Sequence, residues 1–209
     1  FERIRPIVEK ALADNDTKDW PIITLNINDI RSNNPEAYDT VKSLTETYAA
    51  WLCSTTKGAD DSPAPMDIKP VLVLTTGGSQ AKKTFYDDVE AGQPLRLFGA
   101  GDPDTDADNF HRWINYSWSA VEPEGQSRAK DWTDEKAARL QSLVENAHKR
   151  GYWIRFYSLN GHPVTATARL GLSPGYNFGA IEKVRIRWEA AVNAGVDFIA
   201  TDQINETKN

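Results

Sequence analysis

Polar side chains that could bind a ligand lie at the carboxyl ends of two apolar runs in the C-terminal part of the sequence, residues 152–159 and 196–202. They are Tyr157, Ser158, Asn160, Thr201 and Asp202. Ligands of α/β proteins bind at the carboxyl ends of parallel strands. Hydroxyl, amide and carboxylate groups at such ends can hydrogen-bond a polar or charged ligand. We therefore expect a binding site where these two runs end.

Arg155 and Tyr157 lie two residues apart in the first of these runs. Side chains alternate along a strand, so an inward-pointing Arg155 implies an inward-pointing Tyr157. Arginine can bind a phosphate through two parallel hydrogen bonds, and tyrosine can stack or hydrogen-bond. The pattern fits a phosphate-binding pair, and equally a structural arginine that makes a buried ion pair.

A glycine pair follows the apolar run 71–74, in the sequence Thr-Thr-Gly-Gly-Ser-Gln at residues 75–80. Glycines before a helix allow backbone N–H groups to approach an anion, which makes Gly78 and Ser79 candidate phosphate contacts. The segment is neither a Walker A loop nor a dinucleotide-binding G-x-G-x-x-G motif. The alternative interpretation is a tight turn between a strand and a helix.

Motifs for a resident metal are not found in the sequence. Aspartates alternate along residues 102–108, but an EF-hand loop needs glycine and glutamate where this sequence has Ala107 and Trp113. This segment is predicted to be a solvated acidic loop. The three histidines have no recognisable metal-ligand spacing; they are His111, His148 and His162.

The polar residues at 157–160 and 201–202 come at the ends of two successive units, each of which has a helix, a glycine and an apolar strand. Their ranges are Thr133–Arg150, Gly151 and 152–159, then Ala180–Ala194, Gly195 and 196–202. A helix that ends at a left-handed glycine and continues into a strand is typical of α/β proteins. Further apolar runs read as strands at 22–28, 71–74, 95–98 and 112–121, and further helical patterns cover 1–13, 35–54 and 80–91. Five or six strands alternating with helices predict a parallel sheet in one α/β domain over residues 1–209.

Composition restricts the class of partner. The formal net charge is −6 and 40% of the residues are hydrophobic. An acidic surface argues against binding nucleic acid through bulk electrostatics. No run of about 18 apolar residues occurs, so no transmembrane segment is predicted. The expected partner is a small-molecule or lipid substrate.

Two C-terminal stretches, Ala147–Tyr157 and Trp188–Asp202, carry a family resemblance. They read Ala-His-Lys-Arg-Gly-Tyr-Trp-Ile-Arg-Phe-Tyr and Trp-Glu-Ala-Ala-Val-Asn-Ala-Gly-Val-Asp-Phe-Ile-Ala-Thr-Asp. Together they resemble the phosphatidylinositol-phospholipase-C-like phosphodiesterases, which include glycerophosphodiester phosphodiesterases and venom sphingomyelinase D. The resemblance implies a TIM-type (β/α) barrel and a phosphoric diester hydrolase acting on a phospholipid or glycerophosphodiester. It also implies a Mg²⁺ or Ca²⁺ cofactor.

The resemblance places Tyr157 where relatives have an aromatic residue of the substrate pocket. Asn26 and Asn28 are the best match to an Asp and a Lys, two residues apart, that serve metal and phosphate in the family. The family's two catalytic histidines and its acidic pair of metal ligands have no counterpart in this sequence. The chain is therefore expected to be the C-terminal portion of a (β/α)₈ barrel whose first strands precede Phe1, or else a degenerate relative.

The substrate-binding residues predicted on all these grounds are Asn26, Asn28, Gly78, Ser79, Trp118, Arg155, Tyr157 and Asp202. One alternative function is a non-catalytic barrel that binds a phosphate or sugar ligand, because the histidines are missing. A third is a TIM-barrel glycoside hydrolase, suggested by the seven tryptophans. That reaction needs two carboxylates, for which the sequence offers Asp202 and Asp29.

Overall fold

The computed structural model describes residues 1–14, 16–28, 35–76, 78–169, 171 and 174–207. These residues divide into two compact units. The first comprises Phe1–Gly101 with Ala107–Arg112, and the second comprises Asp102–Asp106 with Trp113–Asn209. The single domain expected from the sequence stays a prediction, and each unit is considered by itself.

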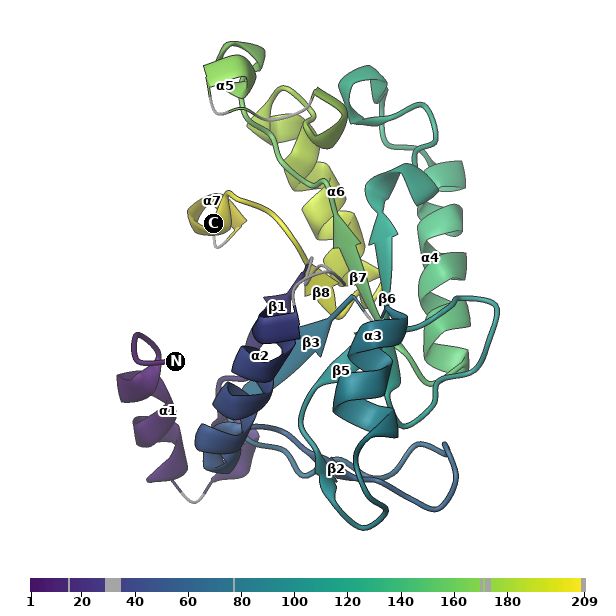
Figure 1. The fold of residues 1–209 in the computed structure, drawn as a ribbon. Helices are drawn as coiled ribbons and strands as arrows, with labels where there is room; N and C mark the ends of the chain where they lie inside the picture. The colour runs from purple at the N-terminus through teal and green to yellow at the C-terminus, as the bar shows by residue number, and fades with distance from the viewer. Residues whose placement is uncertain (15, 29–34, 77, 170, 172–173, 208–209) are drawn as a thin grey trace. The chain divides into compact units, whose positions relative to one another are not determined.

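The first unit is built on three parallel strands in the order β1-β3-β5 (Figure 1). Its elements are α1 (Arg5–Leu12), η1 (Thr17–Asp19), β1 (Ile23–Ile27), α2 (Pro35–Thr47), η2 (Ala49–Trp51), β2 (Thr55–Thr56), β3 (Val71–Thr75), α3 (Ser79–Lys82), η3 (Lys83–Asp87), β4 (Pro94–Leu95) and β5 (Phe98–Ala100). All five residues of β3 are buried. An uninterrupted apolar run is what a central parallel strand requires, because both of its faces are covered.

Two helices of the first unit end earlier than the sequence pattern predicts. The helix expected over 35–54 ends at Thr47, because the chain leaves it to join the sheet: the backbone N–H of Cys53 donates to the carbonyl of Val71 at 2.7 Å. The helix expected over 80–91 becomes α3 and the π-helix η3. There the ammonium of Lys57 donates to the carbonyls of Tyr86 and Val89, both at 2.6 Å.

The second unit contains parallel strands in the order β6-β7-β8. Its elements are β6 (His111–Ser117), whose first two residues belong to the first unit, η4 (Trp118–Ala120), η5 (Gln126–Arg128), α4 (Asp134–Lys149), β7 (Trp153–Tyr157), α5 (Val164–Arg169), η6 (Pro174–Tyr176), α6 (Ile181–Asn193), β8 (Phe198–Ile199) and α7 (Ile204–Thr207). The last strand is much shorter than the predicted run 196–202. After Ile199 the chain leaves the sheet, and Thr201 and Asp202 instead donate hydrogen bonds to Asn160 in the loop after β7.

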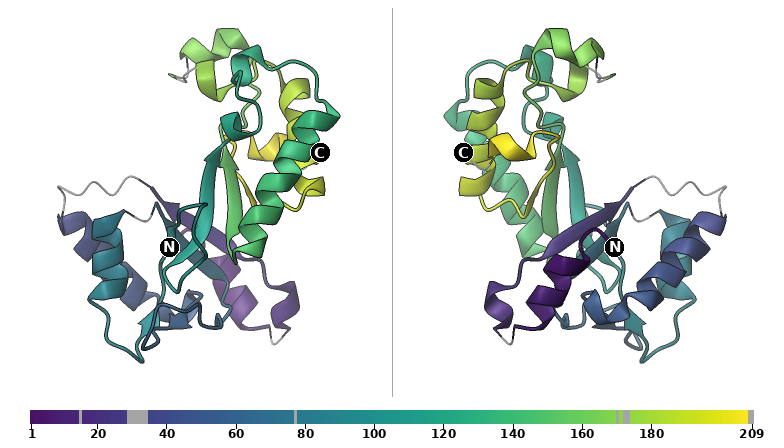
Figure 2. Two further views of the ribbon diagram at one scale, coloured as in Figure 1. Left: turned by 90° about the vertical axis from the view of Figure 1, so that its right-hand side faces the viewer. Right: turned by 90° about the vertical axis from the view of Figure 1, so that its left-hand side faces the viewer.

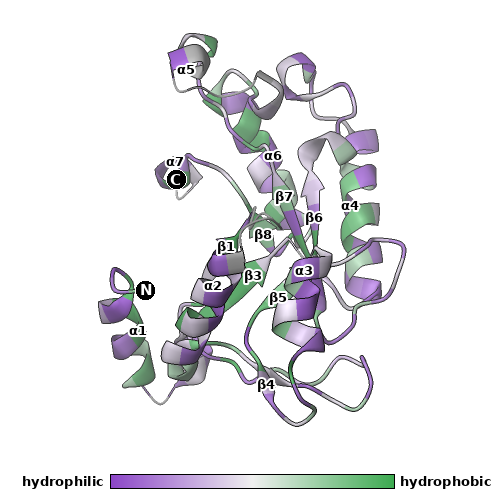
Figure 3. Ribbon diagram, in the orientation of Figure 1, coloured by the Kyte–Doolittle hydropathy of each residue, from purple (hydrophilic) through white to green (hydrophobic). Residues whose placement is uncertain are grey.

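The two predicted helix–glycine–strand joints are confirmed. The hydroxyl of Thr133 caps α4 by accepting from the backbone N–H of Lys136 at 3.4 Å. Gly151 and Gly195 have φ values of 82° and 81°, the left-handed region in which glycine carries little penalty. Helix α4 lies alongside β7 in Figure 2, and Figure 3 shows apolar and polar residues recurring along it. Its inner stripe therefore anchors the strand that carries the candidate site.

The predicted α/β class with a parallel sheet is confirmed. In the first unit β1, β3 and β5 pair in parallel ladders, and in the second unit β6, β7 and β8 do so as well. The short strands β2 and β4 form a separate antiparallel pair. Within the described part of the chain, no helix combines the length and the hydropathy needed to cross a bilayer.

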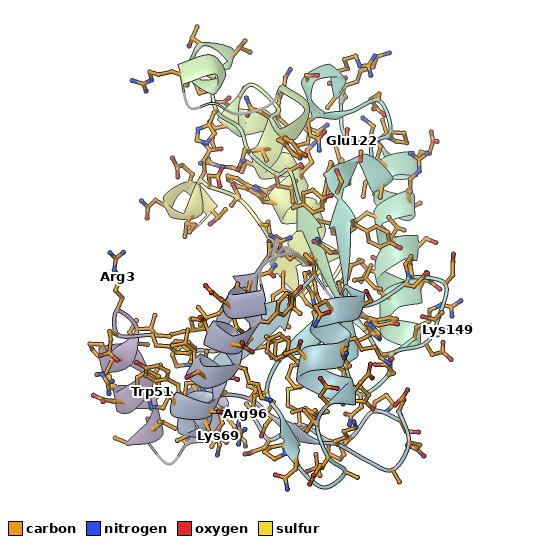
Figure 4. The ribbon with its side chains drawn as sticks, viewed as in Figure 1. Arg3, Trp51, Lys69, Arg96, Glu122 and Lys149 are labelled. Carbon is orange, nitrogen blue, oxygen red and sulfur yellow. The ribbon has the colours of Figure 1, made fainter. Side chains whose placement is uncertain are left out.

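A buried ion cluster fixes the segment after β6 in the second unit. Glu122, labelled in Figure 4, is fully buried. Its carboxylate accepts from Arg187 of α6 at 2.8 and 2.9 Å, from Lys136 of α4 at 2.7 Å, and from the indole of Trp118 at 2.8 Å. A bidentate Arg–carboxylate pair is among the stronger polar contacts in proteins. This cluster ties α4 and α6 to the end of β6.

Candidate ligand-binding site

A cavity of about 640 Å³ lies at the carboxyl ends of β7 and β8 in the second unit. All five polar residues predicted at these strand ends line it: Tyr157, Ser158, Asn160, Thr201 and Asp202. Arg155 lines it as well. The polar residues expected at these strand ends therefore lie together, because the ends of neighbouring parallel strands meet at one edge of a sheet.

Alternation along β7 directs Arg155 and Tyr157 to the same side. Both are half-buried, whereas Ile154 and Phe156, the residues on either side of Arg155, are fully buried on the other face. The guanidinium carbon of Arg155 lies 5.8 Å from the centroid of the Tyr157 ring. The predicted pairing of these two side chains is thus present, with the cation near an aromatic ring.

Arg155 is a partly desolvated cation. Its Nη1 donates to Oδ1 of Asn115 on β6 at 2.7 Å. No carboxylate of the described residues forms an ion pair with it, so the buried ion pair considered as the alternative is not observed among them. Burial lowers the pKa of the guanidinium, and the neighbouring Tyr157 acts in the opposite direction. An arginine remains protonated at neutral pH, so the positive charge of Arg155 favours binding of an anion in the cavity.

Asn160 joins the ends of β7 and β8. Its side-chain oxygen accepts from the hydroxyl of Thr201 at 2.9 Å and from the backbone N–H of Asp202 at 2.8 Å. Its amide nitrogen donates to Oδ2 of Asp202 at 2.9 Å. Asn160 is buried, and these three side-chain hydrogen bonds all reach the β8 loop. The position of the Asp202 carboxylate at the cavity is therefore fixed by its neighbours.

Ser158 has an unusual backbone conformation for a residue with a side chain. Its φ is 69°, and among the described residues it is the one non-glycine with a positive φ. Its hydroxyl oxygen is buried and has no hydrogen-bond partner within the described structure. A left-handed conformation costs about 1–2 kcal/mol for such residues, so the fold sustains strain at the cavity wall.

The predicted contacts on β1 belong to the first unit. Asn26 lies on β1, and neither polar atom of its side chain has a partner among the residues described. Asn28 follows the strand and is exposed. Both residues therefore belong to the first unit, whereas the cavity belongs to the second.

The glycine pair at 77–78 gives little support to a phosphate cradle. Gly77 lies outside the described residues. Gly78 has an ordinary φ of −59°, and a Cβ built on it would meet no atom within 4 Å. Ser79 is exposed at the start of α3, a helix of only four residues. The geometry at Gly78 and Ser79 is that of the alternative interpretation, a turn between strand and helix.

Trp118 does not line the cavity. It is fully buried, its ring centroids lie 5.3 Å from Phe156 and 5.9 Å from Trp132, and its indole donates to Glu122. Its place in the core argues against the predicted substrate contact. The reason is that a bulky aromatic residue after a strand serves core packing as well as pocket walls, and the sequence does not distinguish the two.

None of the three histidines is among the described residues that line the cavity. His148 contacts Asp197 at 2.9 Å and His111 contacts Asp108 at 2.7 Å, while His162 offers its backbone carbonyl to Asn177. The cavity therefore has no histidine for general acid–base chemistry among its described lining residues. Asp29, the second carboxylate of the glycosidase alternative, lies outside the described residues.

The described residues do not fit the Mg²⁺ or Ca²⁺ that the family resemblance implies. Nowhere in the described part of the chain do three or more His, Cys, Asp or Glu side chains gather to hold a cation. Asn26 supplies a single neutral oxygen without a partner, whereas these cations take several oxygen ligands, carboxylates among them. A bound cation thus stays a prediction from the resemblance.

Two residues of the site were missed from the sequence. Asn115 is the hydrogen-bond partner of Arg155, and the parallel register places the two directly opposite each other. Tyr176 lines the cavity from the long connection after β7. A strand alignment of β6 with β7 could have found Asn115. No local pattern marks Tyr176, because its position depends on the path of a loop.

The chain matches no protein-family model, and neither a curated protein nor a solved structure is significantly similar to it.

Proposed function

We propose that this chain is the C-terminal part of a TIM-type (β/α)₈ barrel and binds a phosphodiester of the phospholipid or glycerophosphodiester class. The complete protein is then a phosphoric diester hydrolase. The observation that carries the proposal is Arg155, a half-buried cation on the cavity wall without a carboxylate partner among the described residues. The sequence resemblance supports the same ligand class from separate evidence.

The cavity is suited to hold a phosphate in a defined position. A guanidinium can donate two parallel hydrogen bonds to phosphate oxygens, and Asn115 already fixes one of its nitrogens. Partial burial strengthens the attraction, because the surroundings screen the charge less than water does. Arg155 would bind the phosphate, and the network at Asn160 would hold the opposite wall in place.

Hydrolysis needs proton transfer that the described cavity residues do not supply. In the related phosphodiesterases two histidines act as acid and base, and their counterparts would have to come from outside the described lining. This observation favours a second candidate, a non-catalytic protein that binds a phosphate or sugar ligand. The glycoside hydrolase is the weakest candidate, because Asp202 is the single carboxylate that lines the cavity among the described residues.

Binding and turnover separate these candidates. Isothermal titration with inorganic phosphate would measure binding in the parent protein, in Arg155→Gln, and in Arg185→Gln. Arg185 is an exposed arginine on α6 that does not line the cavity, so its variant is a matched control for lost positive charge. We expect binding to fall at least about ten-fold in Arg155→Gln and to be unchanged in the control. Equal affinity in all three proteins would overturn the proposal.

Turnover of bis(p-nitrophenyl) phosphate, with and without EDTA, then distinguishes hydrolase from binder. Activity that EDTA abolishes and Mg²⁺ or Ca²⁺ restores supports the hydrolase. Phosphate binding without turnover under any of these conditions supports the non-catalytic protein.

A further inference from the structure

The dipeptide Asn160–Gly161, in the loop after β7, is a chemically reactive sequence that occurs once in the chain. An asparagine before a glycine readily loses its side-chain amide, because glycine has no side chain to hinder its own backbone nitrogen. That nitrogen gives up its proton and attacks Cγ of the asparagine. A cyclic imide forms, and the side-chain nitrogen leaves as ammonia. Water then opens the imide to aspartate or isoaspartate, and no oxidant or cofactor takes part.

The packing of α6 requires a glycine at position 161. A Cβ built there would lie 2.6 Å from a methyl carbon of Val184, 2.7 Å from the carbonyl oxygen of Ala180 and 2.8 Å from Cα of Ile181. Two of these atoms belong to the backbone, so a larger residue does not fit. Asn160 is needed as well, because both ends of its amide bond to the loop after β8. The fold therefore depends on a reactive pair of residues.

Hydrogen bonds hold every group that takes part in the reaction. The backbone N–H of Gly161 donates to the side-chain oxygen of Gln203, in a buried contact. The carbonyl of the same peptide bond accepts from the backbone N–H of Phe178 at 2.8 Å. The side-chain nitrogen of Asn160, which would leave as ammonia, donates to Asp202 at 2.9 Å. A peptide plane held on both sides cannot turn its nitrogen toward Cγ, so the reaction needs these bonds to open first.

We propose that Asn160 is a deamidation site that Gln203 protects, and that the amide is lost when the loop after β8 moves away from Gly161. Gln203 is buried and lies between β8 and α7. Short loops open locally without unfolding of the whole domain, so a protected group reacts at a rate set by that opening. The reaction is irreversible, and each opening therefore contributes to a permanent change of the protein.

The product differs from the parent at the cavity wall. Asn160 lines the cavity, and its side-chain nitrogen lies 2.9 Å from Oδ2 of Asp202. A carboxylate oxygen in that place brings two like charges together. On the proposed function, on which this step alone rests, the added negative charge opposes binding of an anion at Arg155. The variant Asn160→Asp reproduces the product, and its phosphate affinity in isothermal titration should be about ten-fold lower than that of the parent.

Peptide mapping by mass spectrometry measures the reaction directly in folded protein held at mildly alkaline pH. In Gln203→Ala, deamidation at Asn160 should be at least about ten-fold faster than in the parent, because loss of one buried hydrogen bond favours opening by about that factor. Gln203→Glu retains an oxygen that accepts from Gly161 and should react as slowly as the parent. Gln141→Ala, which removes an exposed glutamine of α4, is the matched control and should also react slowly.

The parent protein unfolded in urea gives the rate without protection. Equal rates in folded and unfolded parent would overturn the proposal, because the fold would then protect nothing. Equal rates in Gln203→Ala and the folded parent would overturn the role of Gln203. Circular dichroism shows whether Gln203→Ala is folded; if it is not, Gln203→Asn, whose amide ends one methylene short of Gly161, replaces it with the same expectation. A parent that binds no phosphate would overturn the proposed function and leave the deamidation result unaffected.

Discussion

Asn160 contacts Asp202 through both ends of its side-chain amide. The nitrogen donates to the Asp202 carboxylate at 2.9 Å, and the oxygen accepts from the Asp202 backbone at 2.8 Å. The two residues come from the loops after β7 and β8. One buried amide thus joins neighbouring strand ends and orients a carboxylate that lines the cavity. This relationship makes loop structure and ligand binding depend on the same residue.

Replacing Asn160 by alanine should therefore weaken both the structure of these loops and the binding of ligand. The backbone N–H of Asp202 and the hydroxyl of Thr201 would lose their partner, and leaving such groups unsatisfied costs about 1–3 kcal/mol. Urea unfolding should show this loss, and the affinity for inorganic phosphate in isothermal titration should decrease. Asn205→Ala, an exposed asparagine of α7, should change neither property. An unchanged urea midpoint in Asn160→Ala would show that water replaces the amide at no cost.

Replacing Ser158 by glycine should stabilise the protein. Its φ of 69° is strained for serine and ordinary for glycine, and its buried hydroxyl has no partner among the described residues. The gain should be about 0.5–1 kcal/mol, after the higher entropy of glycine in the unfolded chain is subtracted. Urea midpoints would measure it.

The reverse substitution serves as the control for this prediction. Gly195 has a φ of 81° and open space around its Cβ position, so Gly195→Ala should destabilise by about 1 kcal/mol through backbone strain alone. Destabilisation by Ser158→Gly would mean that the serine hydroxyl has a favourable contact in solution.

Glu122 should make stability depend on pH in the acidic range. Burial by itself raises its pKa, but hydrogen bonds from Arg187, Lys136 and Trp118 outweigh burial and hold the pKa below the ordinary 4.5. A pKa that is lower in the folded state gives stability that is present above the unfolded pKa. That stability is lost as the pH falls through the folded pKa. The free energy of unfolding should therefore decrease as the pH drops below about 4.5.

The variant Glu122→Gln isolates this contribution. It leaves the buried Arg187 without its carboxylate, while Lys136 keeps Glu124 as a partner at 3.2 Å, and the change should cost about 3–5 kcal/mol at pH 7. Its stability should also change less than that of the parent protein between about pH 5 and pH 3. Glu189→Gln, an exposed glutamate on α6, should retain the parent pH dependence. Parallel pH profiles for Glu122→Gln and the parent would contradict the assignment.

Local features of the fold could be predicted from the sequence. The cap at Thr133 and the left-handed Gly151 and Gly195 follow from rules that involve only a few neighbouring residues. The alternation that turns Arg155 and Tyr157 to one side is equally local. Because the ends of parallel strands lie at one edge, this local pattern also located the cavity.

Contacts between distant residues could not be predicted in the same way. Glu122 and Arg187 are 65 residues apart, and an isolated glutamate in a polar stretch gives no sign that it will be buried. Asn115 and Arg155 are 40 residues apart and meet only through strand register. Hydropathy likewise did not separate Trp118, a core residue, from a pocket aromatic. These properties depend on tertiary packing, which one sequence does not encode in a local pattern.

The strongest test of the charge at Arg155 is the change Asn115→Asp. The side chains are nearly equal in size, and Asn115 Oδ1 already accepts from Arg155 at 2.7 Å, so the variant should form the ion pair that the parent lacks. The pair should add up to about 1 kcal/mol to the free energy of unfolding, because Arg155 is partly desolvated. The same pair neutralises the cation, so phosphate affinity should fall about ten-fold in isothermal titration. Asn115→Ala removes the contact without adding charge and should retain most of the affinity. Stability and binding should thus change in opposite directions only in Asn115→Asp. Unchanged phosphate affinity in that variant would mean that Arg155 is not the anion site.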